Sequence, residues 1–257
     1  MHTVALPADV SRIQTLREEE LEEARSIQRV MLPASPLSTG EVTVCHAFQP
    51  MAEVGGDFLD YFQLTDGRIG LYVGDVSGKG LPAAMYAALA VGTLRGVHKT
   101  GQPPGHVLAT LNRRLMIRGT PRRHAAVQYA VFDPQSREMQ IASAGMPGPV
   151  HVSSSECRVL NIEGMPPGLF DPSASYETLI TSLAPGDWFL FFTDGLSDAF
   201  DTHDEAFGIE RMQAFCENHC DKSPEFLLAQ LFSEVEVFTR GRLQHDDMAA
   251  AVFRYEP

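Results

Sequence analysis

Short apolar segments of strand length recur along this 257-residue chain, and they constrain its fold more than any other feature. The first of them, 41–48, 58–64 and 68–76, follow one another and are separated by turn residues such as Thr65-Asp66-Gly67. Later predicted strands include 176–181, 188–192 and 248–255. The helical segments that interrupt the strands come in pairs: 81–98 with 105–118, and 207–218 with 224–240. Strict strand–helix alternation favours a parallel sheet, whereas runs of strands between helix pairs favour antiparallel sheets. We therefore predict an α+β fold in which two mainly antiparallel sheets stack between helix layers.

The first 36 residues differ from the rest of the chain in composition and pattern. Residues 10–32 are rich in Glu, Leu, Arg and Gln, and they predict one helix that ends before Pro33. Its apolar residues lie near one face, which suits an amphipathic helix lying on its own domain or a helix that dimerises or relays a signal. The apolar seam is too short to indicate a coiled coil. We divide the chain into an N-terminal linker or signalling helix (1–36) and one globular domain (37–257).

The charge of the chain excludes two classes of partner. It carries 33 acidic and 20 basic residues, a formal net charge of −13, and such a surface repels nucleic acid and anionic membranes. The N-terminus has no secretion signal, and the longest mainly apolar run, 81–94, is shorter than the roughly 20 residues of a membrane helix. We expect a cytoplasmic protein with no nucleic-acid or membrane partner.

Acidic residues stand at the ends of four apolar strands. Asp57 leads into a strand, and Asp75 and Asp194 each end one. Asp246 and Asp247 stand directly before the last strand. One such residue alone is more often a turn former or helix cap than a ligand. Four such sites would repel one another if they converged, and divalent cations remove that conflict. Oxygen ligands without nearby His or Cys suit Mg²⁺ or Mn²⁺ rather than Zn²⁺.

These acids lie in ordered motifs that resemble a known family. The motifs are Val54-Gly55-Gly56-Asp57-Phe58, Val73-Gly74-Asp75-Val76-Ser77-Gly78-Lys79-Gly80, Phe192-Thr193-Asp194-Gly195 and Asp246-Asp247-Met248. Supporting segments include Gln28-Arg29-Val30-Met31-Leu32-Pro33 and Pro167-Gly168-Leu169. Together they resemble the metal-dependent Ser/Thr phosphatases (PPM, protein phosphatase 2C-like), and most of all the bacterial SpoIIE/RsbU branch. The resemblance covers about residues 24–255.

The resemblance implies a four-layer α-β-β-α sandwich, with residues 37–257 as the phosphatase domain and two divalent cations, Mn²⁺ or Mg²⁺, at one end. Asp75 would bridge both ions, and the main-chain carbonyl of Val76 would contact the first. The remaining ligands would be Asp57, Asp194 and Asp246, with Asp247 as an outer or alternative ligand. Asp75 and Asp194 would act in catalysis through a metal-activated water, with no covalent phosphoenzyme.

Two other residues are weaker candidates for substrate contact. Lys79 is a candidate to hold phosphate, against the alternative of a solvated loop lysine. His245 is a candidate proton donor to the leaving seryl oxygen, although a lone histidine in a polar loop is more often only a surface residue.

The branch implies a substrate and also leaves a rival open. The substrate would be a phosphoserine or phosphothreonine on an anti-anti-sigma (STAS-type) protein. A homodimer through the N-terminal helix is also expected. Three positions depart from the family pattern: Gln128 replaces a common Thr, Met146 replaces the His of an Ala-Gly-His-Pro segment, and Ala249 stands where Thr is frequent. The rival hypothesis is therefore a phosphatase-like scaffold with little turnover, gated by its N-terminal helix.

Overall fold

The computed structural model describes residues 8–98, 100–117 and 123–257 of the chain. Its helices are α1 (Ala8–Arg29), α2 (Gly80–His98), α3 (Pro104–Met116), α4 (Asp194–Ser197), α5 (Gly208–Asn218) and α6 (Pro224–Thr239). Its strands are β1 (Leu37–Ser38), β2 (Val42–Gln49), β3 (Phe58–Gln63), β4 (Ile69–Val76), β5 (Ala125–Asp133), β6 (Glu138–Ala144), β7 (Val150–Val152), β8 (Cys157–Val159), β9 (Leu179–Ser182), β10 (Trp188–Phe192) and β11 (Met248–Tyr255). Arg118, where the second predicted helix ends, lies outside the described residues, as do residues 1–7 of the predicted N-terminal segment.

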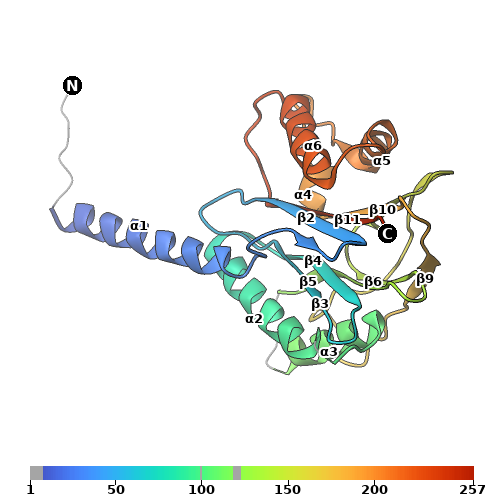
Figure 1. Cartoon of the computed structure of the whole chain (residues 1–257). Helices are drawn as coiled ribbons and strands as arrows, with labels where there is room; N and C mark the ends of the chain where they lie inside the picture. The colour runs from blue at the N-terminus through green and yellow to red at the C-terminus, as the bar shows by residue number, and fades with distance from the viewer. Residues whose placement is uncertain (1–7, 99, 118–122) are drawn as a thin grey trace.

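Two antiparallel sheets form the centre of the molecule (Figure 1). One has six strands in the order β1-β2-β11-β10-β7-β8, and the other has five in the order β3-β4-β5-β6-β9. The last strand, β11, lies between β2 and β10, so the two ends of the domain pair along eight positions from Val42↔Tyr255 to Gln49↔Met248. Every strand pairing in the described residues is antiparallel, which confirms the predicted fold class.

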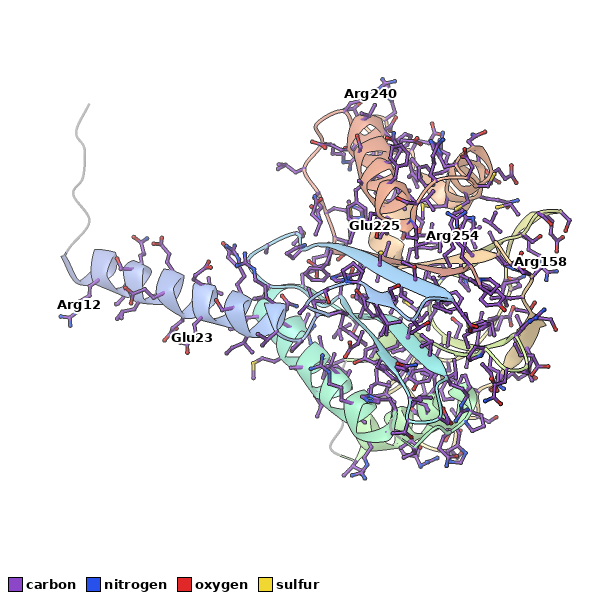
Figure 2. The ribbon with its side chains drawn as sticks, viewed as in Figure 1. Arg12, Glu23, Arg158, Glu225, Arg240 and Arg254 are labelled. Carbon is purple, nitrogen blue, oxygen red and sulfur yellow. The ribbon has the colours of Figure 1, made fainter. Side chains whose placement is uncertain are left out.

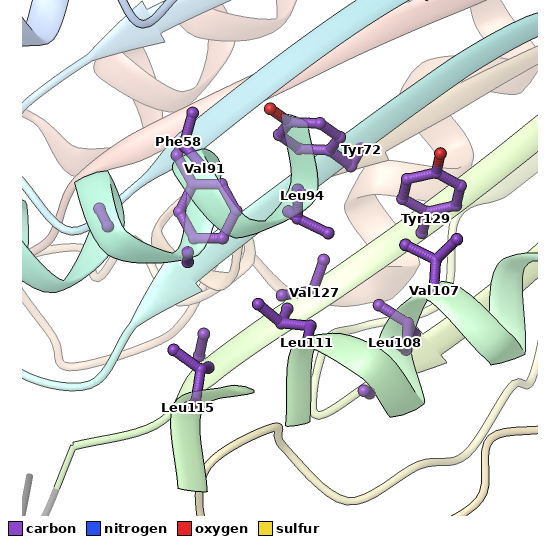
Figure 3. Packing of buried hydrophobic residues seen from close by; sticks show 14 of the residues in the cluster. Phe58, Tyr72, Val91, Leu94, Val107, Leu108, Leu111, Leu115, Val127 and Tyr129 are labelled. Atoms are coloured by element: carbon purple, nitrogen blue, oxygen red, sulfur yellow. The ribbon is translucent and has the colours of Figure 1, made fainter. Parts of the chain in front are cut away.

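Helix pairs cover the outer faces of both sheets, giving four layers. Helices α2 and α3 contact β4, β5 and β6, whereas α5 and α6 contact β2, β7, β8 and β11. One apolar cluster fills the space under α2 and α3, where Leu94, Leu108 and Leu111 pack on Tyr72 and Tyr129 (Figure 3). A second cluster fills the space between the sheets, and a third lies under α5 and α6. Because β11 is covered on both faces, all eight of its side chains are buried.

Local sequence signals explain where the elements end. The Thr65-Asp66-Gly67 turn closes the β3–β4 hairpin, and Gly67 supplies the positive φ of +90° that this turn needs. Helix α6 begins at Pro224 behind an N-cap serine, Ser223, whose Oγ accepts a hydrogen bond from the Phe226 main-chain N–H. It ends at Arg240 and Gly241, which have φ values of +52° and +79°.

Helix α1 projects from one end of the sandwich (Figure 1). Its labelled side chains Arg12 and Glu23 point away from the rest of the chain (Figure 2). Only its last turns contact the domain, where Gln28 is buried and Met31, just past the helix, packs against the cluster under α2. In the part of the chain that the structure describes, every helix is too short or too polar to cross a lipid bilayer.

Candidate metal centre

The acidic strand ends converge where the two sheets meet. Asp57 directly precedes β3 and Asp75 is the penultimate residue of β4, and the β3–β4 register pairs Phe58 with Gly74. On the other sheet, Asp194 follows β10, and Asp246 and Asp247 precede β11. The side chains of Asp57 and Asp75 are close enough to hydrogen-bond each other, and the charges of Asp194, Asp246 and Asp247 act on Asp75. The structure therefore brings all five predicted carboxylates together.

Burial and mutual repulsion disturb these carboxylates. Burial raises the pKa of Asp57 well above its ordinary value, and the charge of Asp75 raises it further. Burial, followed by the charge of Asp194, raises the pKa of Asp75 to about 7. The pKa of Asp194 is raised by burial first, and then by the charges of Asp198 and Asp246. The centre thus holds more negative charge than its own surroundings neutralise.

The donor set fits hard divalent cations. Every candidate side-chain ligand is a carboxylate oxygen, and two divalent ions would offset four of the five negative charges that these groups carry when ionised. In the described part of the chain, no three or more His, Cys, Asp or Glu side chains are already gathered tightly enough to hold a metal ion. The fit therefore rests on the chemistry and the excess charge of the carboxylates, which a bound cation would draw closer.

Gly56 lets the loop that carries Asp57 approach the end of β4. A Cβ atom at this position would lie 2.8 Å from the carbonyl oxygen of Val76 and 3.1 Å from Asp75 Oδ1. Real Cβ atoms do not approach so closely, so glycine is required here. The carbonyl of Val76, which the resemblance names as a ligand, consequently faces the Asp57 loop.

Asp247 uses both of its oxygens on the main chain. Oδ1 accepts a hydrogen bond from the Met51 N–H and Oδ2 accepts one from the Gly56 N–H, each at 2.7 Å. The side chain is buried and ties the loop between β2 and β3 to the start of β11. This arrangement favours the outer position that the resemblance left open for Asp247.

Two residues without a predicted role also hold the centre. The Thr193 hydroxyl donates a 2.7 Å hydrogen bond to Asp57 Oδ2, and it accepts one from the Ala249 N–H. Gln28 of α1 bonds Gly55 in both directions: its Nε2 donates to the Gly55 carbonyl, and its Oε1 accepts from the Gly55 N–H. The signal for Thr193 was its position directly before Asp194 in a buried strand end. Gln28 begins the motif Gln28-Arg29-Val30-Met31-Leu32-Pro33, but no neighbouring residue in the sequence indicates that Gly55 is its partner.

The two weaker candidates flank the acidic group differently. Lys79 Nζ lies 3.2 Å from Asp246 Oδ2. Among the ion pairs of the described residues, this one includes a candidate metal ligand. The His245 ring packs edge-on against Phe200, with 5.2 Å between ring centroids.

Gln128 and Met146, two of the departures from the family pattern, are both associated with the loop after β6. Gln128 of β5 is buried and donates a hydrogen bond from Nε2 to the Pro147 carbonyl. The neighbouring Ser143 hydroxyl donates to the carbonyl of Met146, whose side chain is buried in the cluster between the sheets. Both substitutions therefore serve packing of the loop after β6.

Comparison with known proteins agrees with the fold and the motifs. The family profile described as Stage II sporulation protein E (SpoIIE) matches residues 65–256. Phosphoserine phosphatase RsbU of Bacillus subtilis is 24% identical over 251 residues, covering 94% of this chain and 73% of RsbU. Protein IcfG of Synechocystis is 25% identical over 267 residues, covering 91% of this chain, and the match spans 41% of IcfG.

A solved structure shows the same fold. The SiaA-PP2C domain of Pseudomonas aeruginosa superposes with a TM-score of 0.85 at 23% identity, covering 96% of this chain and 99% of that domain. The profile match extends over most of the chain and includes three of the four acidic motifs. The chain therefore belongs to the SpoIIE family, the branch of metal-dependent Ser/Thr phosphatases that its motifs indicated.

Proposed function

We propose that this chain is a metal-dependent protein serine/threonine phosphatase that hydrolyses phosphoserine or phosphothreonine. The observation that carries the proposal is the convergence of Asp57, Asp75, Asp194 and Asp246 from two sheets, with raised pKa values at the first three. A buried acidic group of this kind costs stability unless a cation compensates it, so a purely structural role does not account for it.

Each residue has a role in this mechanism. Asp75 would bridge two cations, Asp57, Asp194 and Asp246 would complete their ligands, and Val76 would contribute its carbonyl. When bound, two Mn²⁺ or Mg²⁺ ions would supply a polarised water and neutralise charge on the phosphoryl oxygens. Thr193 holds Asp57 in one orientation through its 2.7 Å hydrogen bond, and Asp247 fixes the loop beside it.

The remaining roles concern the substrate. Lys79 would hold the phosphate, and His245 would give a proton to the leaving seryl oxygen as the phosphorus–oxygen bond breaks. We further propose an anti-anti-sigma (STAS-type) phosphoprotein as the substrate, supported by the similarity to RsbU and to phosphoserine phosphatase RsbP, which is 24% identical over 192 residues.

Hydrolysis of a small aryl phosphate tests the activity directly. Wild type should need Mn²⁺ or Mg²⁺ and lose activity in EDTA, and Asp194→Asn should lose it with either metal. Asp221→Asn is the matched control, because Asp221 is exposed and forms an ion pair with its neighbour Lys222. Metal-independent hydrolysis, or full activity in Asp194→Asn, would contradict the proposal.

A second candidate function is a phosphatase-like scaffold with little turnover, gated by the N-terminal helix. The bond between Gln28 and Gly55 favours gating, because it links α1 to the loop that carries Asp57. We propose that residues 1–36 form this signalling segment, and that the exposed Ile13, Leu16 and Ile27 pair with a second copy of the chain. A chain shortened to begin at Pro33 tests this, since unchanged activity and unchanged oligomeric state would exclude it.

A further inference from the structure

Asp246 has no free oxygen toward the acidic centre. Its Oδ1 accepts a 3.0 Å hydrogen bond from the Asp247 main-chain N–H. Its Oδ2 lies 3.2 Å from the ammonium nitrogen of Lys79. A cation that binds Asp246 must therefore share or replace one of these partners, and the main-chain N–H cannot leave without moving the start of β11.

Lys79 is the partner that can leave. Gly78 and Gly80 on either side have φ values of +93° and +67°, a conformation in which the loop turns sharply after β4. The loop itself is held, because the Ser77 N–H donates to the His124 carbonyl and the His124 N–H donates to Ser77 Oγ, each at 3.0 Å. The Lys79 side chain remains 43% exposed, so rotation about its own bonds is sufficient to change partner.

The charge balance also favours exchange. Asp246 raises the pKa of both Asp75 and Asp194, so its charge belongs to the same repulsive group. Lys79 offsets one negative charge in that group. A divalent cation offsets two and binds several carboxylates at once, so it would displace a single ammonium group from Asp246.

We propose that Lys79 is the resident counter-ion of Asp246: it occupies Oδ2 until a divalent cation takes that oxygen, and the released ammonium group then pairs with the phosphate of the substrate. This inference rests on the proposed function and adds an order of events to it. A lysine serves such an exchange well, because it meets phosphate as a compact point charge and needs no fixed bidentate geometry.

Metal binding to the stripped protein tests the first half. Mn²⁺ is titrated by calorimetry into EDTA-treated, dialysed wild type, Lys79→Met, Lys79→Arg and Lys222→Met. Lys222 is the matched control, since it is 44% exposed and its Nζ lies 3.0 Å from Asp221. We expect Lys79→Met to bind Mn²⁺ about three- to fivefold more tightly, the upper part of the range for a partly exposed ion pair. Lys79→Arg and Lys222→Met should match wild type.

Thermal unfolding of the same metal-free samples gives a readout that does not depend on turnover. Lys79→Met should unfold at a lower temperature than Lys222→Met without metal, because Asp246 then lacks its counter-ion. Added Mn²⁺ should remove that difference. An equal unfolding temperature without metal, together with equal Mn²⁺ affinity, would overturn the inference.

Inhibition by inorganic phosphate tests the second half. In the Mn²⁺-loaded enzyme, Lys79→Met should require at least about threefold more phosphate for half-inhibition of aryl phosphate hydrolysis, and Lys79→Arg should restore sensitivity. Unchanged inhibition would overturn the phosphate role of Lys79 while leaving the counter-ion role intact. If wild type binds no Mn²⁺ at all, the proposed function itself fails, which is a different result from equal binding by wild type and Lys79→Met.

Discussion

Asp75 and Asp247 belong to the same acidic group, but replacing each with asparagine should change the free energy of unfolding in opposite directions. In the metal-free protein, Asp75→Asn should raise the free energy of unfolding and Asp247→Asn should lower it. Asp75 meets mainly other carboxylates, whereas Asp247 accepts two main-chain hydrogen bonds. An acid among like charges and an acid held by main-chain N–H groups should therefore respond in opposite ways.

The magnitudes follow from the two environments. The pKa of Asp75 is raised from 3.8 to about 7, which at 1.36 kcal/mol per unit sets a ceiling of about 4 kcal/mol on the gain from neutralising it at pH 7.5. Since the hydrogen bond from Asp57 lowers the pKa of Asp75 and is weakened when Asp75 becomes asparagine, we expect about half of that gain, about 2 kcal/mol. Asparagine at position 247 keeps one acceptor and turns an NH₂ group toward the other N–H, which loses a charge-assisted hydrogen bond and costs about 2 kcal/mol.

Urea unfolding followed by circular dichroism, at pH 7.5 in EDTA, measures both changes. In thermal unfolding the same changes correspond to shifts of roughly 4–8 °C in opposite directions for a domain of this size. Asp221→Asn on the exposed surface serves as the isosteric control and should match wild type. A shift of stability in the same direction for both substitutions would refute this prediction, because the two acids would then share one environment.

Three further predictions concern packing, the N-terminal helix and pH. Gly195→Ala places a Cβ against the main-chain carbonyl of Asp247 and should lower the free energy of unfolding by about 1–3 kcal/mol. Gly92→Ala, in open space on α2, is the control and should leave the free energy of unfolding unchanged or raise it. Urea unfolding measures both changes. Gln28→Ala leaves the N–H and C=O of Gly55 without their partner and should cost about 1–3 kcal/mol, and equal stability by the same assay would contradict this. Burial lowers the pKa of His151, so the unfolded chain takes up its proton first as pH falls. Relative to His151→Phe, wild type should lose up to about 1 kcal/mol between pH 7.5 and 5.5, and a constant difference across this range would refute the assignment.

Local sequence pattern was sufficient to predict most strands and the strand-end position of each acid. The 188–192 and 248–255 strands agree with β10 and β11 residue for residue, because continuous apolar runs bounded by turn residues have few alternatives. The strand predicted at 176–181 is β9, Leu179–Ser182, and the difference has a tertiary cause. The Tyr176 side chain is buried under α2 and α3, and the Thr178 hydroxyl accepts the Gly105 N–H, so this stretch follows the start of α3 before it joins the sheet.

Long-range partners account for what the pattern could not predict. Asp246 and Asp247 are chemically identical neighbours, and nothing in their local sequence shows which of them accepts hydrogen bonds from the loop that carries Asp57. The distinction arises from the Met51 and Gly56 N–H groups, which lie more than 190 positions away in the chain. Gln28 is similar, since its partner Gly55 lies 27 positions along and on a different element. Hydrophobic periodicity predicts which face of a helix or strand is buried, but it does not predict which distant polar group that face will contact.

The placement of the acids also explains why a cation suits this fold. The five-stranded sheet contributes Asp57 and Asp75, and the six-stranded sheet contributes Asp194 and Asp246. Apolar packing between the sheets, including Phe132 on Phe253, holds the two halves together elsewhere, whereas at this end like charges oppose contact. A cation bound by acids of both sheets would turn that repulsion into a link across the sandwich. Cation binding would therefore stabilise this end of the sandwich, where the Asp57 loop is hydrogen-bonded to both Asp247 and Gln28.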